Sequence, residues 1–241
     1  MLERLDTPES VAQVLSLTCS DQDGVMQNTR KHVTGIYNNR YGTEHTYDEI
    51  RDWTTLYDWG LEIGMPPKEA LAVEAELWRT PEIVIGAEPI PGAIEFLERA
   101  YYDYKIRIPI VSSRLPKLYD CTVEWYRART SVVTPEQIFV GLPDIASGEI
   151  SKVLRVMVLG KKYHLEDSHT QVQLFLDYTD DINILYLSNR TILDRYLSTG
   201  RLIRFPGENG GEPTMWPIYE LFFGPRPYSV AQSIDNIPPL G

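Results

Sequence analysis

The chain has 241 residues, 43% of them hydrophobic, which is enough to bury a sizeable core in one large domain or in one domain with an insertion. Its formal net charge is −11, and because an acidic surface repels polyanions, we exclude a protein that coats duplex DNA or RNA. Two cysteines, Cys19 and Cys121, are too few for a disulfide framework or a zinc site. No stretch approaches the ~20 apolar residues that span a bilayer, so we expect a soluble, cytoplasmic protein.

The first predicted strand, over residues 14–19, is followed by the pentapeptide Asp-Gln-Asp-Gly-Val, which begins at Asp21. Side chains two apart on an extended chain point to the same side, so Asp21 and Asp23 can face one reacting centre, while Gly24 allows a sharp turn. Two such carboxylates suit a divalent cation and a phosphoryl group. A calcium loop is the competing interpretation, but it needs a Glu at its twelfth position, where this chain has His32.

Residues 26–86 are predicted to be mostly helical. Apolar residues recur with helical spacing between Asn28 and Tyr41, and a capping-box pattern at residues 46–49 begins a short helix. A pair of prolines at positions 66 and 67 begins another helix, which runs to Trp78. No convincing strand interrupts this segment.

From about residue 87 the pattern alternates between strands and helices, which predicts a parallel sheet covered by helices. A strand over 153–159 is the alternative to part of one predicted helix. The predicted elements are helix 93–104, strand 106–111, helix 118–129, strand 138–140, helix 147–165, strand 172–176, a helix up to residue 197 and strand 202–205.

After Pro206 the chain is rich in glycine, proline and aromatic residues. Three interpretations are open: an ordered arm that wraps the domain, a contact between subunits, or a partly disordered tail. The aromatic residues between Trp216 and Phe223 argue against full disorder.

Polar residues follow three of the predicted strands, at the sheet edge where parallel sheets bind ligands. Together they supply a nucleophile, a hydroxyl donor, a cation and metal ligands. They are Asp21 and Asp23, Ser112, and Asp177 with Asp181, and Lys152 lies at the start of the helix before the Asp177 strand.

The order of these motifs resembles the four motifs of the haloacid dehalogenase (HAD) superfamily over about residues 12–206. This resemblance implies an α/β fold with a Rossmann-like parallel sheet, helices on both faces and a small helical cap inserted after the first strand. The implied core comprises residues 10–25 and 87–206, the cap residues 26–86, and a C-terminal arm or extension residues 207–241.

The resemblance also implies roles for single residues. Asp21 would attack phosphorus and form an aspartyl-phosphate, and Asp23 would protonate the leaving oxygen and later activate water. Ser112 and Lys152 would hold the phosphoryl oxygens. A Mg²⁺ ion suits these oxygen ligands, and the implied metal ligands are Asp21, Asp23 (through its main-chain carbonyl), Asp177 and Asp181, with Asp181 acting through water or by orienting Lys152.

The second carboxylate favours a phosphatase over a dehalogenase, because a phosphate ester needs an acid for its alkoxide and a halide does not. Within the superfamily the chain is most similar to cytosolic-type 5′(3′)-deoxyribonucleotidases, on the DxDGV start, residues 40–42 and 46–50, Trp53, and residues 89–93. That likeness implies a (deoxy)nucleoside monophosphate as the small phosphorylated substrate. Trp53 could then stack on the base, with Ser113 and Arg114 as further substrate contacts.

Several alternatives stay open. Ser113 competes with Ser112, Lys161 and Lys162 compete with Lys152, and Arg114 suits a salt bridge as well as a substrate contact. The substrate could be another small phosphometabolite or a polynucleotide end, although the acidic charge argues against a polymer. A catalytically silent binding or assembly module is the alternative of a different class, and a homodimer through the cap or the arm is open.

Overall fold

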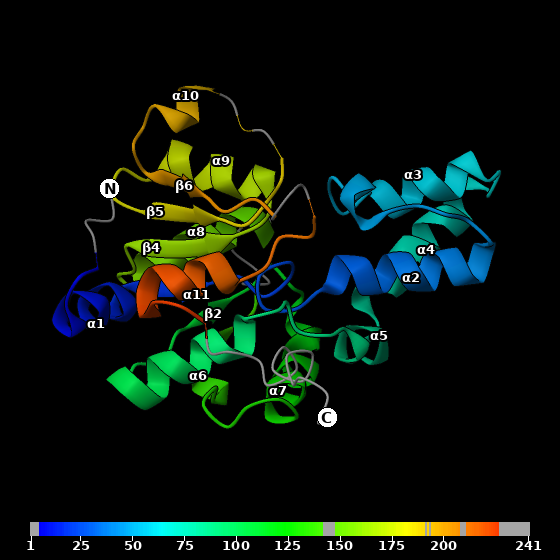
Figure 1. The fold of residues 1–241 in the computed structure, drawn as a ribbon. Helices are drawn as coiled ribbons and strands as arrows, with labels where there is room; N and C mark the ends of the chain where they lie inside the picture. The colour runs from blue at the N-terminus through cyan, green and yellow to red at the C-terminus, as the bar shows by residue number, and fades with distance from the viewer. Residues whose placement is uncertain (1–4, 142–147, 191, 193, 208–210, 227–241) are drawn as a thin grey trace, which may run out of the picture.

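The computed structural model describes residues 5–141, 148–190, 192, 194–207 and 211–226. Its strands form one six-stranded sheet in the order β3-β2-β1-β4-β5-β6, and every neighbouring pair is parallel (Figure 1). The predicted α/β fold with a parallel sheet is therefore confirmed. The strands are β1 Thr18–Ser20, β2 Ile110–Val111, β3 Ile138–Phe139, β4 Tyr163–Glu166, β5 Asn183–Tyr186 and β6 Leu202–Arg204.

The strand order reverses at β1, which pairs with β2 on one side and with β4 on the other. Ser20, the last residue of β1, is opposite Ile110 of β2 and Leu165 of β4. Ligands of open parallel sheets bind beside such a switch point, at the carboxyl ends of the strands. The residues that directly follow β1 and β4 therefore occupy the position where chemistry is expected.

Helices cover both faces of the sheet (Figure 1). Alternation along β5 shows this, because Leu185 belongs to one hydrophobic cluster and its neighbour Ile184 to the other. The first cluster includes side chains of α1, α6, α7 and α11, and the second includes side chains of α8, α9 and α10. These helices are α1 Pro8–Ser16, α6 Ala93–Tyr104, α7 Tyr119–Arg127, α8 Gly148–Val158, α9 His169–Tyr178, α10 Asp194–Leu197 and α11 Trp216–Phe223.

The predicted strand over residues 14–19 begins too early, because its first three residues end helix α1. Thr7 starts that helix through a capping box with Ser10, and Val11 and Leu15 bury one helical face. β1 therefore keeps only the last part of the predicted strand.

The sequence-based assignment of residues 153–186 is wrong in three places. Residues 172–176, predicted as a strand, lie inside α9, whose N-cap Ser168 accepts a hydrogen bond from the Gln171 amide. Strands β4 and β5 fall where helices were predicted, and the alternative strand over 153–159 belongs mostly to α8. A five-residue segment with four apolar residues fits a buried helical face as well as a strand, and here the helix cap decides.

A helical insertion follows β1, as the sequence predicts, and lies beside the sheet (Figure 1). Helices α2, α3 and α4 enclose a hydrophobic cluster of their own, which includes Tyr37, Trp59 and Leu77. The exact limits of this domain, residues 26 and 86, remain a prediction. The insertion comprises α2 Thr29–Tyr41, the 3₁₀ helix η1 Tyr47–Glu49, α3 Thr55–Glu62, α4 Pro67–Arg79 and α5 Pro81–Gly86.

Helix α11, near the C-terminus, packs on the core. Phe222 meets Phe96 of α6 edge to face with ring centroids 5.6 Å apart, and Ile218 and Tyr219 are buried in the same cluster. The predicted C-terminal arm thus contains an ordered helix, while residues 227–241 lie outside the described part of the chain. None of the helices in the described residues is long and apolar enough to cross a membrane.

Candidate functional site

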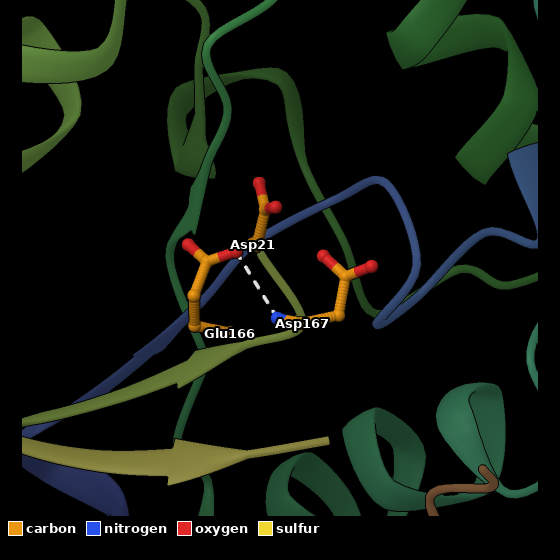
Figure 2. Close-up of side chains that lie close together, drawn as sticks. All are labelled: Asp21, Glu166 and Asp167. Atoms are coloured by element: carbon orange, nitrogen blue, oxygen red, sulfur yellow. Dashed lines mark hydrogen bonds between the residues drawn. The ribbon is translucent and has the colours of Figure 1, made fainter. Parts of the chain in front are cut away.

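Three buried carboxylates meet at the carboxyl ends of β1 and β4 (Figure 2). Asp21 directly follows β1, Glu166 ends β4, and Asp167 is the next residue. One carboxylate oxygen from each lies within 4.8 Å of the other two. Oxygen ligands of this kind suit a hard divalent cation such as Mg²⁺, so this acidic triad could hold a metal ion.

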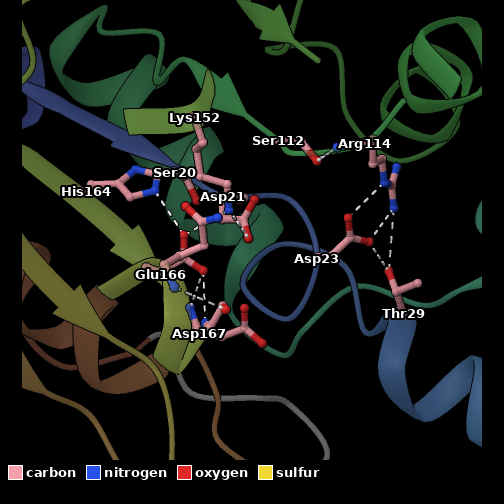
Figure 3. Close-up of polar contacts among 12 residues, drawn as sticks. Ser20, Asp21, Asp23, Thr29, Ser112, Arg114, Lys152, His164, Glu166 and Asp167 are labelled. Atoms are coloured by element: carbon pink, nitrogen blue, oxygen red, sulfur yellow. Dashed lines mark hydrogen bonds and ion pairs between the residues drawn. The ribbon is translucent and has the colours of Figure 1, made fainter. Parts of the chain in front are cut away.

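Lys152 of α8 neutralises part of this charge. Its Nζ lies 2.9 Å from Asp21 Oδ2 and 2.9 Å from Glu166 Oε2, and its side chain is only 3% exposed (Figure 3). Lys161 instead donates to the Ser16 carbonyl. The structure therefore brings Lys152 to Asp21, as preferred from the sequence, and leaves its two competitors, Lys161 and Lys162, elsewhere.

The surroundings shift the pKa values of the three carboxyl groups in different directions. Burial raises the pKa of Asp21 well above its ordinary value, the nearby Glu166 charge adds to this, and Lys152 offsets only a part. Burial also acts to raise the pKa of Glu166, but Lys152 and His164 together outweigh it, and the net pKa lies far below the ordinary value. For Asp167, burial raises the pKa to about 6 although Arg30 opposes the shift. A bound divalent cation would favour the ionised form of all three.

Asp23 lies outside the triad and is held by an arginine. Arg114 Nε and Nη2 bind its two carboxylate oxygens at 2.9 and 2.6 Å, and Thr29 Oγ1 donates to Oδ1 at 2.5 Å (Figure 3). Burial alone would raise the pKa of Asp23, but the charge and hydrogen bonds of Arg114, with Thr29, bring it below its ordinary value. In this arrangement Asp23 is a carboxylate, and Arg114 forms the salt bridge that the sequence left open.

The two serines after β2 differ in their surroundings. Ser112 Oγ is buried and accepts the Arg114 amide at 3.2 Å. Ser113 lines the pocket beside Asp21, and its buried Oγ has no hydrogen-bond partner among the described residues. The geometry thus places Ser113, rather than Ser112, next to the pocket.

A pocket with a volume of about 50 Å³ adjoins the acidic triad. The core contributes Asp21, Lys152 and Asp167 to its lining, and the insertion contributes Trp53 and Trp78. The Trp53 ring is 41% exposed and meets Trp78 edge to face at 4.9 Å. A larger neighbouring cavity of about 630 Å³ shares the Asp167 lining but does not include Asp21.

The predicted metal ligands Asp177 and Asp181 do not reach this site. Asp177 lies in α9 and accepts a hydrogen bond from the Tyr196 hydroxyl at 2.9 Å. The Asp181 side chain is 64% exposed and pairs with Lys162 at the surface. Their assignment followed from the mistaken strand over residues 172–176, and the carboxylates that meet Asp21 are Glu166 and Asp167 instead.

Adjacent carboxylates at positions 166 and 167, followed by a helix-capping serine, were the signal for this part of the site. Strand β4 is not evident in the sequence, because it contains the polar residues His164 and Glu166. They are compatible with burial because they pair with each other at 3.2 Å, and His164 Nδ1 also lies 3.2 Å from Cys19 Sγ. Cys19 is buried, and burial raises the pKa of its thiol far above its ordinary value, which favours the neutral thiol.

Comparison with known proteins supports the fold. No protein-family model and no curated protein sequence matches the chain. Among solved structures it is similar to a HAD family hydrolase from Deinococcus radiodurans R1 with bound phosphate and sodium, at 16% identity and a TM-score of 0.53, covering 78% of this chain and 89% of that one. A protein provisionally described as a haloacid dehalogenase-like hydrolase, from Bacteroides fragilis, matches at 15% identity and a TM-score of 0.53, covering 81% and 98%.

A third similar structure, provisionally described as a beta-phosphoglucomutase from Bacteroides vulgatus, has 16% identity and a TM-score of 0.50, and the match covers 85% of this chain and 87% of that one. At identities this low the likeness is one of fold. The chain therefore has an HAD-like fold, and its activity has to be argued from its own residues.

We expect Gly24→Ala to disturb the acidic triad. Gly24 has φ +77°, and a Cβ there would lie 1.9 Å from Asp167 Oδ2. The left-handed backbone alone costs a non-glycine residue ~1–2 kcal/mol, and displacement of Asp167 adds to this. Urea unfolding should show the stability loss, and the rise in melting temperature caused by Mg²⁺ should shrink.

Gly42→Ala is the matched control, because Gly42 has φ +68° and nothing within 4 Å of a built Cβ. It should lose only the backbone contribution and keep its full response to Mg²⁺. Equal behaviour of the two variants would show that the close approach of Gly24 to Asp167 is unimportant.

The Asp23–Arg114 pair predicts a pH-dependent contribution to stability. The folded-state pKa of Asp23 is lowered, so the contribution is complete above about pH 4, the ordinary range of an aspartate, and is lost as the pH falls through the lowered value. Wild type should exceed Asp23→Asn in unfolding free energy at pH 7, and the difference should shrink below pH 4, because protonated Asp and Asn are both neutral.

Urea unfolding of both proteins from pH 7 to pH 3 measures this difference. Asp103→Asn is the control, since it removes a carboxylate from an exposed arginine pair with Arg99. If the difference in unfolding free energy between wild type and Asp23→Asn stays constant from pH 7 to pH 3, the pKa of Asp23 is not lowered by Arg114.

Proposed function

We propose that this protein is a metal-dependent phosphomonoester hydrolase that works through an aspartyl-phosphate on Asp21. One observation carries the proposal: the two oxygens of this buried carboxylate have different surroundings. Lys152 holds Oδ2 at 2.9 Å, while Oδ1 has no hydrogen-bond partner among the described residues. A carboxylate fixed through one oxygen has the other available to attack phosphorus. The HAD-like fold supports the same chemistry by analogy.

Mg²⁺ is the proposed cofactor, held by Asp21, Glu166 and Asp167. When bound, it would neutralise charge on the phosphoryl group, which is the main requirement of phosphoryl transfer. The chain itself adds the Lys152 ammonium and the unpartnered Ser113 hydroxyl near the pocket. A contribution of the Asp23 main-chain carbonyl to the metal site, and one of the Ser112 hydroxyl to phosphate binding, remain predictions.

Asp23 is the proposed proton carrier, first as the acid for the leaving oxygen and then as the base for water. Arg114 and Thr29 hold it as the carboxylate, the form that the base step needs. A phosphate dianion bound beside it adds a like charge, which raises the pKa of Asp23 toward the form that the acid step needs. The acid step also requires Asp23 to exchange a contact with Arg114 for the leaving oxygen.

A (deoxy)nucleoside 5′-monophosphate is the substrate that the resemblance favours, and the exposed ring of Trp53 at the pocket supports it. The pocket volume of about 50 Å³ favours a second candidate, a smaller phosphometabolite, because a nucleoside would enter only after the insertion moves away from the sheet. The net charge of −11 argues against a polynucleotide end. The presence of both a nucleophile and a proton carrier argues against a silent assembly module, and a homodimer stays open.

Asp21→Asn should reduce the release of phosphate from p-nitrophenyl phosphate at least about 10³-fold, because the amide cannot form the covalent intermediate. Circular dichroism should show an unchanged fold. Asp177→Asn and Asp181→Asn are the controls and should keep their activity, since neither carboxylate lies at the pocket. An active Asp21→Asn enzyme would contradict the assignment of the nucleophile.

Chelation with EDTA should stop hydrolysis, and Mg²⁺ should restore it. Glu166→Gln should raise the Mg²⁺ concentration needed for half-maximal activity, because it removes one charged oxygen of the acidic triad. Activity that is indifferent to EDTA would exclude the proposed metal site while leaving the Asp21 experiment independent of it.

A further inference from the structure

Two buried side chains of the pocket have polar atoms without hydrogen-bond partners among the described residues. Gln171, in the first turn of α9, is 4% exposed, and its Oε1 is unpartnered. Trp78, near the end of α4, is 7% exposed, and its Nε1 is unpartnered. One belongs to the core and the other to the insertion, and both line the pocket beside Asp21.

Unpartnered polar atoms are concentrated at this pocket. Of the ten buried side-chain atoms without a partner in the described part of the chain, four belong to residues that line it. A buried polar atom is costly when nothing bonds to it, so a cluster of them calls for partners from a ligand or from water. Asp21 and Ser113 face the phosphoryl group under the proposed function, which leaves Gln171 and Trp78 for the rest of the substrate.

We propose that Gln171 and Trp78 recognise the leaving group, and that this group is uncharged and offers both a hydrogen-bond acceptor and a donor. The indole N–H of Trp78 can only donate, so the leaving group must present an acceptor to it. The Gln171 oxygen accepts, so the leaving group must present a donor. A sugar with free hydroxyls and a nucleobase with an amide edge both satisfy this requirement. The inference rests on the proposed phosphatase function.

The charged residues of the pocket do not require a charged leaving group. Arg30 already pairs with Asp167 at 3.0 Å, and Lys152 is held by two carboxylates. Arg51 and Asp52 are exposed, so water satisfies their charges and a ligand charge would gain little there. A neutral polar leaving group gains the most binding free energy at this pocket, because it supplies hydrogen-bond partners to the buried unpartnered atoms.

Gln171→Leu and Trp78→Phe test the proposal, since both remove the hydrogen-bonding atoms, the first at nearly constant volume and the second with retention of an aromatic ring. We would measure kcat/KM for a nucleoside 5′-monophosphate and a hexose phosphate, each divided by kcat/KM for phenyl phosphate, whose leaving group offers neither a donor nor a further acceptor. For the true substrate class this ratio should fall about tenfold to a hundredfold in both variants.

Gln173→Leu and Trp59→Phe are the matched controls. Gln173 is on the same helix but bonds to His169, and Trp59 is buried in the insertion, where it stacks on His45. Neither lines the pocket beside Asp21, and both controls should leave the ratio unchanged.

The outcomes are distinct. A fall for the nucleotide alone assigns the pair to a nucleobase, and a fall for the hexose phosphate alone assigns it to sugar hydroxyls. An unchanged ratio for both substrates in an active enzyme overturns the inference and means that water alone satisfies Gln171 and Trp78. If the wild type hydrolyses no phosphoester, the proposed function fails, and the same ratio measured from calorimetric dissociation constants of the three compounds then tests the inference by itself.

Discussion

The ion pairs of the buried Lys152 ammonium are the interaction on which the rest of the site depends. Three carboxylates from β1 and β4 could not lie so close together without a buried cation, because their mutual repulsion and desolvation would separate or protonate them. Removal of one partner from such a buried pair typically costs ~3–5 kcal/mol. Lys152 also reaches the site from α8, whose Val153 and Val156 belong to one of the two main hydrophobic clusters. Helix α8 therefore both packs in the hydrophobic core and supplies the buried cation of the site.

A second cation, Arg114, gives the two aspartates of the DxDGV pentapeptide different pKa values. Burial and neighbouring carboxylates raise the pKa of Asp21, while Arg114, Thr29 and Lys152 together outweigh burial and lower the pKa of Asp23. The pKa values of two carboxyl groups two residues apart are therefore shifted in opposite directions, because each has its own environment. The proposed tasks need the reverse, an ionised Asp21 for attack and a protonated Asp23 for the leaving oxygen. A bound divalent cation would favour the ionised form of Asp21, and a bound phosphate dianion would raise the pKa of Asp23.

The sequence predicted the parts of the site that depend on local patterns, and it failed where distant pairing decides. The pentapeptide after β1 and the serines after β2 directly follow strands that the sequence predicts. Lys152 was preferred over two other lysines because it lies near the start of a predicted helix. Glu166 and Asp167 were missed because polar residues hide the strand pattern of β4, and their partners become evident only in the fold: His164 pairs with Glu166 and lies beside Cys19 of β1. The mostly apolar residues 172–176 were predicted as a strand, because the buried helical face to which they belong and the N-cap at Ser168 become evident only in the fold.

The insertion and the core are linked through the same carboxylates that the proposed chemistry uses. The first turn of α2 supplies both Thr29, which bonds to Asp23, and Arg30, which pairs with Asp167 at 3.0 Å. Arg190, which follows β5, donates to main-chain carbonyls of residues 48–51, next to the part of the insertion that lines the pocket. A movement of the insertion would therefore change the partners of Asp23 and of the acidic triad.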